Sequence, residues 1–488
     1  MNDLKARTVR GGLARLLGQA ASFPLRLVSI AILARLLNPD DFGLLAMVTA
    51  VTGVYGLFAS AGLSSATVQK EIVTDAQVST LFWINIGIGI LLALFCMLSA
   101  PVLVAFYHEP RLFWVTIALA SVFLLNAAGV QHYALLQREL RYVALTTIET
   151  LSQAAGIVVG IAMAFAGFSY WSLVGMTLVS TAIGTVCLWL TAAWVPGRPR
   201  QGVGTGTMLR FGGTMTLNGL VVYVGYNFEK VLLGRFWGAD ALGIYGRAYQ
   251  LISIPNENFN AAIGGLAFSA LSRLQQDPVR WRSYFLKGYS LMASFTIPIT
   301  IFCALFSDDI VLVVLGAKWE EAAIVFRLLS PTLLVYGMIN PLGWLLFSTG
   351  RQGRSLATAL VLAPLVITGY LVGLPYGPSG VAFAYSAVMT LWLIPHIVWC
   401  LHGTTISPWD LLSTTGRPLA SGIVAGGAAL LAQLYFAKQG YPFFRLLFSG
   451  CIMVGVYYSM LLLVMGQRAF YVELLAAMRR PTSLEGSP

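Results

Sequence analysis

The sequence predicts an all-α integral membrane protein. Of its 488 residues, 58% are hydrophobic and only 10% are charged, and the mean hydropathy is +0.78. A soluble globular domain carries roughly 25% charged residues. Apolar stretches recur along the chain, and each is long enough to provide the about 20 residues that a helix needs to cross a bilayer. They lack the ten-residue alternation of membrane β-strands, and many are rich in Gly and Ala, as packed membrane helices are.

We expect about fourteen transmembrane helices, taken here in chain order. Lys5, Arg7 and Arg10 precede the first stretch, which is too long for a cleavable signal peptide and should remain as a helix. A first set of six lies at about 12–37, 42–63, 80–106, 112–134, 143–167 and 170–194. A second set lies at about 209–236, 243–268, 285–315, 322–347, 355–375 and 379–402. A last pair follows at about 418–437 and 443–466.

An internal repeat relates the two sets of six. ILARLLNPDDFG at 32–43 returns as LLGRFWGADALG at 232–243. The recurring residues are Leu33, Arg35, Asp40 and Gly43, which return as Leu233, Arg235, Asp240 and Gly243. Six is an even number of spans, so both copies enter the membrane with the same orientation and are related by an axis along the membrane normal. We therefore predict two parallel six-helix lobes, 1–200 and 205–402, around a central cavity, and two extra helices with a cytoplasmic tail at 416–488.

The distribution of basic residues predicts the topology. With a cytoplasmic N-terminus, the connections and tails on that side carry about 20 of the 30 Lys and Arg residues, and the opposite side carries only six. The positive-inside rule therefore places both termini in the cytoplasm. The net charge of +11 arises mostly from this asymmetry. We accordingly expect no nucleic-acid partner.

The sequence lacks the residue patterns of a metal, nucleotide or covalent catalytic site. Its five cysteines and four histidines are widely spaced, and no CxxC, HExxH, GxSxG or Walker motif occurs. Most connections between the predicted spans are shorter than about 20 residues, which leaves no soluble domain for a sugar nucleotide. We therefore predict no cofactor and no enzyme activity. A membrane-bound polysaccharide polymerase or glycosyltransferase is the disfavoured alternative.

The first predicted span carries a polar stripe. Arg15, Gln19, Ser22, Arg26 and Ser29 follow at spacings of four, three, four and three, which places them on one helix face. A charge at the centre of a spanning helix costs about 2.5–3.5 kcal/mol on insertion scales, so such an arginine generally faces water or a partner. Arg26 lies about 16 Å from the outer end of its span, too deep for easy snorkelling. We predict that Arg26 and Arg15 are cavity cations and that Gln19 and Ser22 line the cavity.

The helices that open the second set carry a matching polar stripe. Their cations also require water, carboxylates or an anionic ligand, for the same energetic reason. One alternative is that Glu229 and Glu257 simply neutralise Lys230 and Arg247 as structural ion pairs. We predict instead that the stripe lines the cavity, with the cations Lys230 and Arg247 and the polar residues Asn218, Glu229, Gln250, Glu257 and Asn258.

A second polar group lies on the fifth predicted span. Glu149 and Gln153 are one helical turn apart, so their side chains share a face. Carboxylates inside membrane helices often belong to proton or ion relays. We predict a possible ion relay at these two residues, and a purely structural hydrogen-bond network is the alternative.

Two segments resemble a known family. LARLLNPDDFGLLAM and LLGRFWGADALGIYGRAYQL resemble the repeat signatures of the polysaccharide transporter family, within the multidrug/oligosaccharidyl-lipid/polysaccharide exporter superfamily. The resemblance covers most of residues 1–410 and points to Wzx-type flippases. It implies a two-lobed bundle with a cationic cavity in the bacterial inner membrane. It also implies a lipid-linked oligosaccharide substrate, membrane lipids as surroundings, and a polysaccharide polymerase and glycosyltransferases as partners in the same pathway.

The predicted cations suit such a substrate. Guanidinium groups offer forked, charge-assisted hydrogen bonds to the oxygens of a pyrophosphate, so Arg26 and Arg247 would hold it. The expected function is to move oligosaccharide units for exopolysaccharide, capsule or O-antigen from the cytoplasmic to the outer leaflet by alternating access. A peptidoglycan-precursor flippase shares the cationic cavity and is an alternative. A drug or cation antiporter of the same superfamily should expose carboxylates to its cargo and fits less well.

Overall fold

The regular secondary structure in the described part of the chain is helical. The computed structural model describes residues 18, 22–60, 67–68, 73–200, 206–436, 441–468 and 471. Contacts divide the chain into two compact units. The first unit is Met1–Ile254 with Val314–Val325 and Ala359–Val388, and the second is Pro255–Val313 with Phe326–Thr358 and Met389–Pro488.

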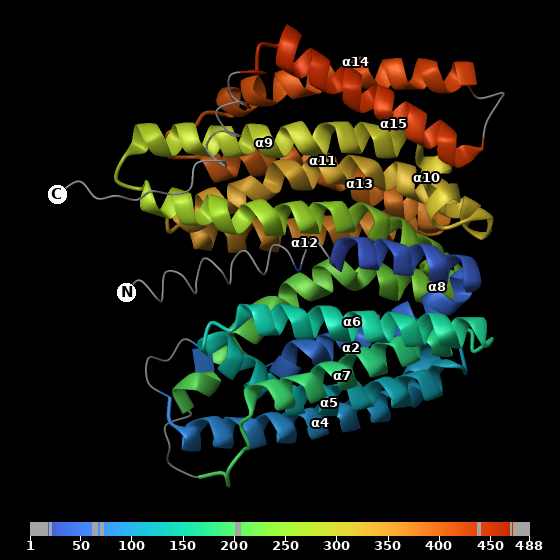
Figure 1. The fold of residues 1–488 in the computed structure, drawn as a ribbon, viewed down its shortest axis with the longest axis vertical. Coiled ribbons are helices and arrows are strands. Elements are labelled where there is room, and N and C mark those ends of the chain that lie inside the picture. The colour runs from blue at the N-terminus through green and yellow to red at the C-terminus, as the bar shows by residue number, and fades with distance from the viewer. Residues whose placement is uncertain are drawn as a thin grey trace. The chain divides into compact units, whose positions relative to one another are not determined.

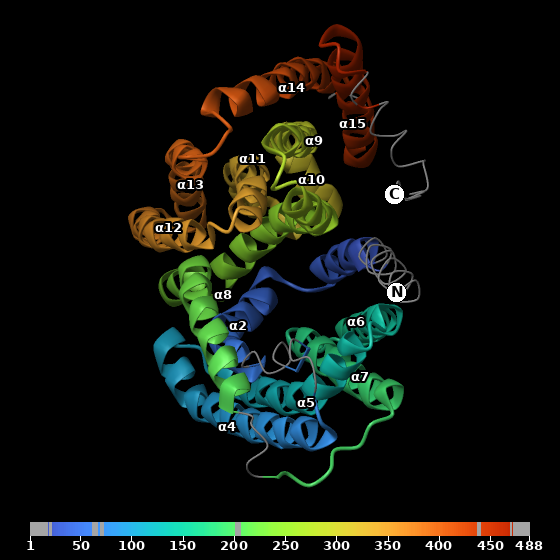
Figure 2. The same ribbon diagram turned by 90° about the vertical axis from the view of Figure 1, so that its left-hand side faces the viewer.

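The first unit is built around two helical hairpins. Its helices include one at 22–36, α2 (Pro39–Ser60), α4 (Asp75–Tyr107), α5 (Leu112–Arg138), α6 (Tyr142–Phe165) and α7 (Trp171–Ala192). Short turns make α4 pack against α5 and α6 against α7, and α5 also contacts α7 (Figure 1 and Figure 2). α2 packs across α4 and α5. The apolar faces of these helices meet in a core that includes Leu92, Cys96 and Phe123.

A long element, α8 (Gly206–Arg273), is two helices that meet at Gly238. Gly238 has φ 83° and ψ −176°, a conformation that glycine adopts without steric cost and that ends the first helix. The predicted boundary between 209–236 and 243–268 falls at this break. The Tyr223 hydroxyl donates to the Thr49 carbonyl at 3.1 Å, so the first part of α8 lies along α2. The chain passes into the second unit at Pro255, which removes one helical hydrogen bond.

The remaining helices belong wholly or partly to the second unit. They are α9 (Pro278–Leu305), α10 (Ser307–Val314), α11 (Glu320–Ser348), α12 (Gln352–Gly373), α13 (Gly377–Leu401), α14 (Pro408–Phe436), α15 (Pro442–Ser459) and the π-helical turn η3 (Met460–Val464). The 3₁₀ turns η1 (Ala317–Trp319) and η2 (Leu374–Tyr376) belong to the first unit. α14 packs on α9 and on α15. Gly422 and Gly426 let α14 approach Ile297 and Ile301 of α9 closely. The last pair of predicted helices is thus docked on α9 rather than free in the bilayer.

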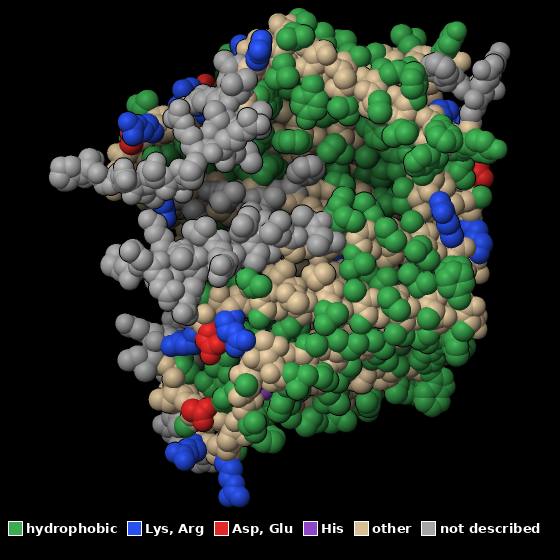
Figure 3. Space-filling model, viewed as in Figure 1, with side chains coloured by type: hydrophobic (Ala, Val, Ile, Leu, Met, Phe, Trp, Pro, Cys, Tyr) green, Lys and Arg blue, Asp and Glu red, His purple; other side chains and the backbone are tan. Residues whose placement is uncertain are grey.

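Ten helical stretches within the described residues are long and apolar enough to cross a membrane. Their exposed sides are dominated by large hydrophobic side chains, whereas Lys, Arg, Asp and Glu gather toward the helix ends (Figure 3). This distribution is what a bilayer requires of a helical bundle. The predicted class, an all-helical membrane protein with many spans, is therefore confirmed.

Most predicted spans match helices of the structure, with one clear exception. The predicted span 285–315 is wrong as a single helix, because α9 ends at Leu305 and a separate α10 starts at Ser307. The reason lies in Asp308 and Asp309, which occupy the first turn of α10, where carboxylates favour a new helix N-terminus. Hydropathy alone does not register this break, since the flanking residues on both sides are apolar.

Candidate binding site

Arg26 lies on the helix at 22–36, and its side chain is exposed. Within the described residues it forms no hydrogen bond or ion pair. Ser22 is half-buried and Ser29 is buried on the same helix, so the stripe separates into a packed serine and an accessible cation. Arg15 and Gln19, which complete the predicted stripe, lie outside the described residues. An exposed guanidinium without a partner among the described residues is suited to an anionic ligand.

Arg247 is half-buried on the second part of α8. Its guanidinium lies 4.1 Å from the centre of the Phe42 ring, a cation–π geometry, and Nη1 donates to the Gln250 side-chain oxygen. Arg247 forms no ion pair among the residues that the structure describes, so the structural pair with Glu257 does not form there. The contacts with Phe42 and Gln250 position the group and leave further N–H donors uncommitted.

Glu229 is buried, with 1% of its surface exposed. The Tyr370 hydroxyl lies within hydrogen-bonding reach of its carboxylate, whereas Oε2 has no hydrogen-bond partner in the described part of the chain. The neighbouring Lys230 does not bond to it, because the Lys230 ammonium donates to the Asn227 side-chain oxygen at 2.7 Å. The alternative of a structural ion pair between Glu229 and Lys230 therefore finds no hydrogen bond among the described contacts.

The other predicted residues are spread over both units. Glu149 is exposed on α6 and accepts a hydrogen bond from the Tyr133 hydroxyl of α5 at 3.2 Å. Gln153 is half-buried one turn further on. Glu257, exposed, and Asn258, half-buried, belong to the second unit, and the side chain of Asn218 is outside the described set. Of the predicted cavity residues, Arg247 and Gln250 are in contact in the first unit. The ion relay at Glu149 and Gln153 stays a prediction.

The sequence reasoning missed a network at the ends of the repeats. Arg111, between α4 and α5, donates to Asp40 at 2.6 Å and to Glu109 at 2.8 Å. The hydrogen bonds from Arg111 lower the pKa of the Glu109 carboxyl. The same ends carry a second contact, because the Trp319 indole N–H donates to the Ala34 carbonyl at 2.8 Å. The recurrence of Asp40 as Asp240 was the one sequence signal that marked this region.

Comparisons with known proteins decide the family. The family model described as "Polysaccharide biosynthesis protein" matches residues 32–324, which is more than half of the chain. The chain belongs to this family. This membership confirms the resemblance drawn from the two repeat signatures, which lie at the start of the matched region and within it.

Three relatives are similar to this chain over most of the length of both proteins. The teichuronic acid biosynthesis protein TuaB of Bacillus subtilis (strain 168) is 28% identical, over 78% of this chain and 80% of the relative. The lipopolysaccharide biosynthesis protein WzxC of Escherichia coli (strain K12) is 26% identical over 76% and 77%. The succinoglycan biosynthesis transport protein ExoT of Rhizobium meliloti (strain 1021) is 23% identical over 86% and 83%.

Two solved structures have a fold similar to that of this chain. The lipid II flippase MurJ, in an inward closed conformation, is similar with a TM-score of 0.74 and 14% identity, over 96% of this chain and 100% of that chain. A multidrug resistance MATE transporter of the MOP superfamily, in an inward-facing conformation, has a TM-score of 0.63 and 11% identity, over 80% of this chain and 94% of that chain. The fold is therefore that of the MOP superfamily.

Proposed function

We propose that this protein moves polyprenyl-pyrophosphate-linked oligosaccharide units from the cytoplasmic to the outer leaflet of a bacterial inner membrane. Arg247 carries the proposal, because it is a half-buried guanidinium on α8 that has no carboxylate partner among the described residues and is positioned by Phe42 and Gln250. Arg26 supports it as a second accessible cation. The family, a relative named as a transport protein and a neighbour in fold named as a lipid II flippase agree with this activity.

The chemistry of the substrate fits these groups. A pyrophosphate presents several charged oxygens, which guanidinium groups bind through short, forked hydrogen bonds. The sugars would hydrogen-bond to amide side chains such as Gln250, while the polyprenyl tail stays in lipid. In the proposed transport cycle, two lobes built from the repeats at 1–200 and 205–402 expose the cations first inside and then outside, and no covalent bond changes. Fourteen helices and two cytoplasmic termini belong to this proposal.

The test is transport by arginine variants in proteoliposomes. The probe is a polyprenyl-pyrophosphate-linked oligosaccharide with a fluorescent sugar, and its arrival in the far leaflet is read with a membrane-impermeant oxidant of vicinal diols. Arg247→Ala and Arg26→Ala should each slow transport at least about tenfold, since each removes charge-assisted hydrogen bonds to the phosphates. Arg280→Ala is the control, because that side chain is 79% exposed and its partner Asp277 lies on the same helix end. Transport at the control rate by both variants would refute the assignment.

A peptidoglycan precursor presents the same pyrophosphate, and it is the second candidate because MurJ shares the fold with a TM-score of 0.74. Rescue of a strain depleted of its own precursor flippase separates the two. We expect no rescue, whereas restored growth at normal expression would assign the protein to precursor transport.

A further inference from the structure

The two copies of the repeat touch each other at equivalent positions. Gly43 lies four residues after Pro39, the first residue of α2. Gly243 lies four residues after Ala239, where α8 resumes after its break at Gly238. A Cβ atom on Gly43 would lie 2.8 Å from Ala239 Cα and closer still to the carbonyl oxygen of Ala239. A Cβ atom on Gly243 would lie 2.7 Å from the carbonyl carbon of Pro39 and closer still to its oxygen. The contact is thus reciprocal, as a two-fold relation between the copies requires.

Only glycine allows this contact. Real Cβ atoms essentially never approach another atom within 3.0 Å, and the atoms in the way are backbone atoms that cannot rotate aside. In glycine, a hydrogen takes the place of Cβ and points at the carbonyl oxygen of the other helix. Such Cα–H···O contacts recur where two helices cross closely, and small residues favour these crossings in membranes. Any larger side chain at Gly43 or Gly243 must push α2 and α8 apart.

The glycine contact lies beside Arg247. Arg247 is four residues after Gly243, so the two lie on one face of α8. The Arg247 guanidinium lies over the ring of Phe42, the residue next to Gly43. Phe42 also packs edge-on against Trp319, with ring centres 5.4 Å apart. The two glycines therefore hold together the helix ends that carry Phe42 and Arg247.

Two hydrogen bonds join the segment at 318–319 to the end of the helix at 22–36 and the residues after it, beside the glycine contact; this region of the first unit is called the corner below. Lys318 Nζ donates to the Asn38 side-chain oxygen at 3.2 Å, and the Trp319 indole donates to the Ala34 carbonyl. Trp319 is completely buried. All these residues belong to the first unit. In the predicted topology the connections at 38–39, 238 and 316–318 lie on the outer face, so this corner closes the outer end of the path to Arg247.

We propose that Gly43 and Gly243 form a closure over Arg247 that separates to release the headgroup outside and then re-forms. This inference rests on the proposed function for the identity of the headgroup. Glycine is needed at both positions because the backbones must return to direct contact after each cycle. The pair thereby determines the accessibility of Arg247 from the outer face.

The test uses matched Gly→Ala pairs in each helix. Gly43→Ala is compared with Gly56→Ala in α2, and Gly243→Ala with Gly246→Ala in α8, because a Cβ at either control position meets nothing within 4 Å. The reporter is Met47→Cys in a variant lacking the five native cysteines. Met47 is 1% exposed and faces Gly234 of α8, one turn along from Gly43. A membrane-impermeant maleimide applied from outside measures its accessibility without any substrate.

We expect Gly43→Ala and Gly243→Ala to raise the labelling rate of Met47→Cys at least about tenfold and to slow transport of the fluorescent lipid-linked oligosaccharide, since a buried thiol reacts only when exposed. The controls should label and transport like the parent. Labelling of both contact variants at the control rate would overturn the closure. If the parent transports no lipid-linked oligosaccharide but the contact variants still open, the proposed function fails and the closure stands.

A cross-link tests the same closure without a bulky substitution. Asn38→Cys and Lys318→Cys, combined in the cysteine-free variant, replace two side chains whose polar atoms are 3.2 Å apart. A bifunctional methanethiosulfonate that spans the length of the lost lysine side chain should join the two thiols and arrest transport, and a reductant should restore it. Undiminished transport by fully cross-linked protein would show that this corner does not need to open, and would overturn the closure even if the glycine variants failed to fold.

Discussion

At the scale of single residues, the charged groups of this protein divide by whether a carboxylate accompanies them. Arg111 and Arg445 have acidic partners and tie helix ends together. Arg26 and Arg247 have none in the described part of the chain. The cost of an isolated charge in a membrane helix is the reason that the sequence analysis predicts both arginines to be cavity cations. The sequence could not reveal the Phe42 ring under Arg247, because that contact joins residues 205 positions apart through the packing of α2 against α8.

The Arg111 network gives a stability prediction with a defined pH dependence. Arg111→Gln should lower the unfolding free energy by about 1 kcal/mol at pH 7, a small value because the arginine is 39% exposed. The folded state lowers the pKa of Glu109, so its contribution is present above the unfolded pKa and is lost as the pH falls through the lowered folded value. The difference between parent and variant should therefore shrink in acid. Thermal unfolding in detergent from pH 7 to pH 3.5 measures this.

The control for that experiment is Arg280→Gln. Its ion pair with Asp277 is 3.3 Å long, and the arginine side chain is 79% exposed, so the substitution should leave the midpoint nearly unchanged. A difference between Arg111→Gln and the parent that stays constant with pH would show that Glu109 contributes nothing through this network.

At the scale of elements, hydropathy located most helices, whereas caps and packing set their ends. The predicted span 112–134 matches α5, and 143–167 matches α6. The predicted start of α14 was ten residues late, because Pro408 and the Asp410 side chain begin that helix before its apolar stretch. The break between α9 and α10 was missed for the same reason. Hydropathy reports where a segment is apolar, but the termini of helices depend on polar residues that satisfy backbone groups.

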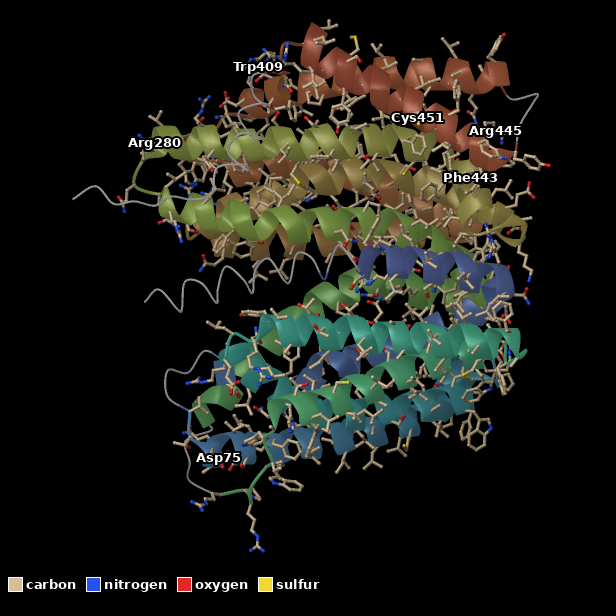
Figure 4. The ribbon with its side chains drawn as sticks, viewed as in Figure 1. Asp75, Arg280, Trp409, Phe443, Arg445 and Cys451 are labelled. Carbon is tan, nitrogen blue, oxygen red and sulfur yellow. The ribbon has the colours of Figure 1, made fainter. Side chains whose placement is uncertain are left out.

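The position of α15 depends on one buried carboxylate. Asp309 of α10 is 2% exposed and accepts hydrogen bonds from Arg445 Nε at 3.0 Å and from Gln433 Nε2 at 2.7 Å. Arg445 lies near Phe443 at one end of the second unit, and Arg280 and Trp409 lie at the other end (Figure 4). Arg445→Gln should lower the unfolding free energy by about 3 kcal/mol, because it leaves the buried carboxylate without its counter-ion.

A neighbouring ion pair supplies the comparison. Arg327 pairs with Asp308, which precedes Asp309 on α10, but the two side chains are 48% and 71% exposed. Arg327→Gln should therefore cost less than about 1 kcal/mol. Thermal midpoints of the two variants in the same detergent test the difference. Equal losses would mean that burial of Asp309 does not determine how firmly α15 is held.

At the scale of the whole molecule, the two repeat signatures of the sequence meet in the structure at Gly43 and Gly243. The sequence predicted two copies but not that they meet, because a repeat fixes orientation and says nothing about which residues touch. The first unit draws segments from both halves of the chain, and the reciprocal contact of Gly43 and Gly243 lies within it. The lobes at 1–200 and 205–402 stay a prediction. Opening and closing at equivalent glycines is the simplest motion that such a repeat allows.

The proposed direction of transport predicts a dependence on membrane potential. An outward-moving pyrophosphate carries negative charge, and an inside-negative potential contributes about 2.3 kcal/mol per charge per 100 mV. Arg26 and Arg247 offset part of this if they move with the substrate, but two arginines fixed in helices cross only a fraction of the field. Proteoliposomes with a potassium gradient and valinomycin set the potential, and maleimide labelling of a cysteine introduced at Arg280, which is 79% exposed at the start of α9, measures protein orientation. Transport should accelerate when the cytoplasmic side is negative and slow when the sign is reversed. Equal rates at both signs would mean that the protein's cations fully compensate the charge of the substrate, contrary to this prediction.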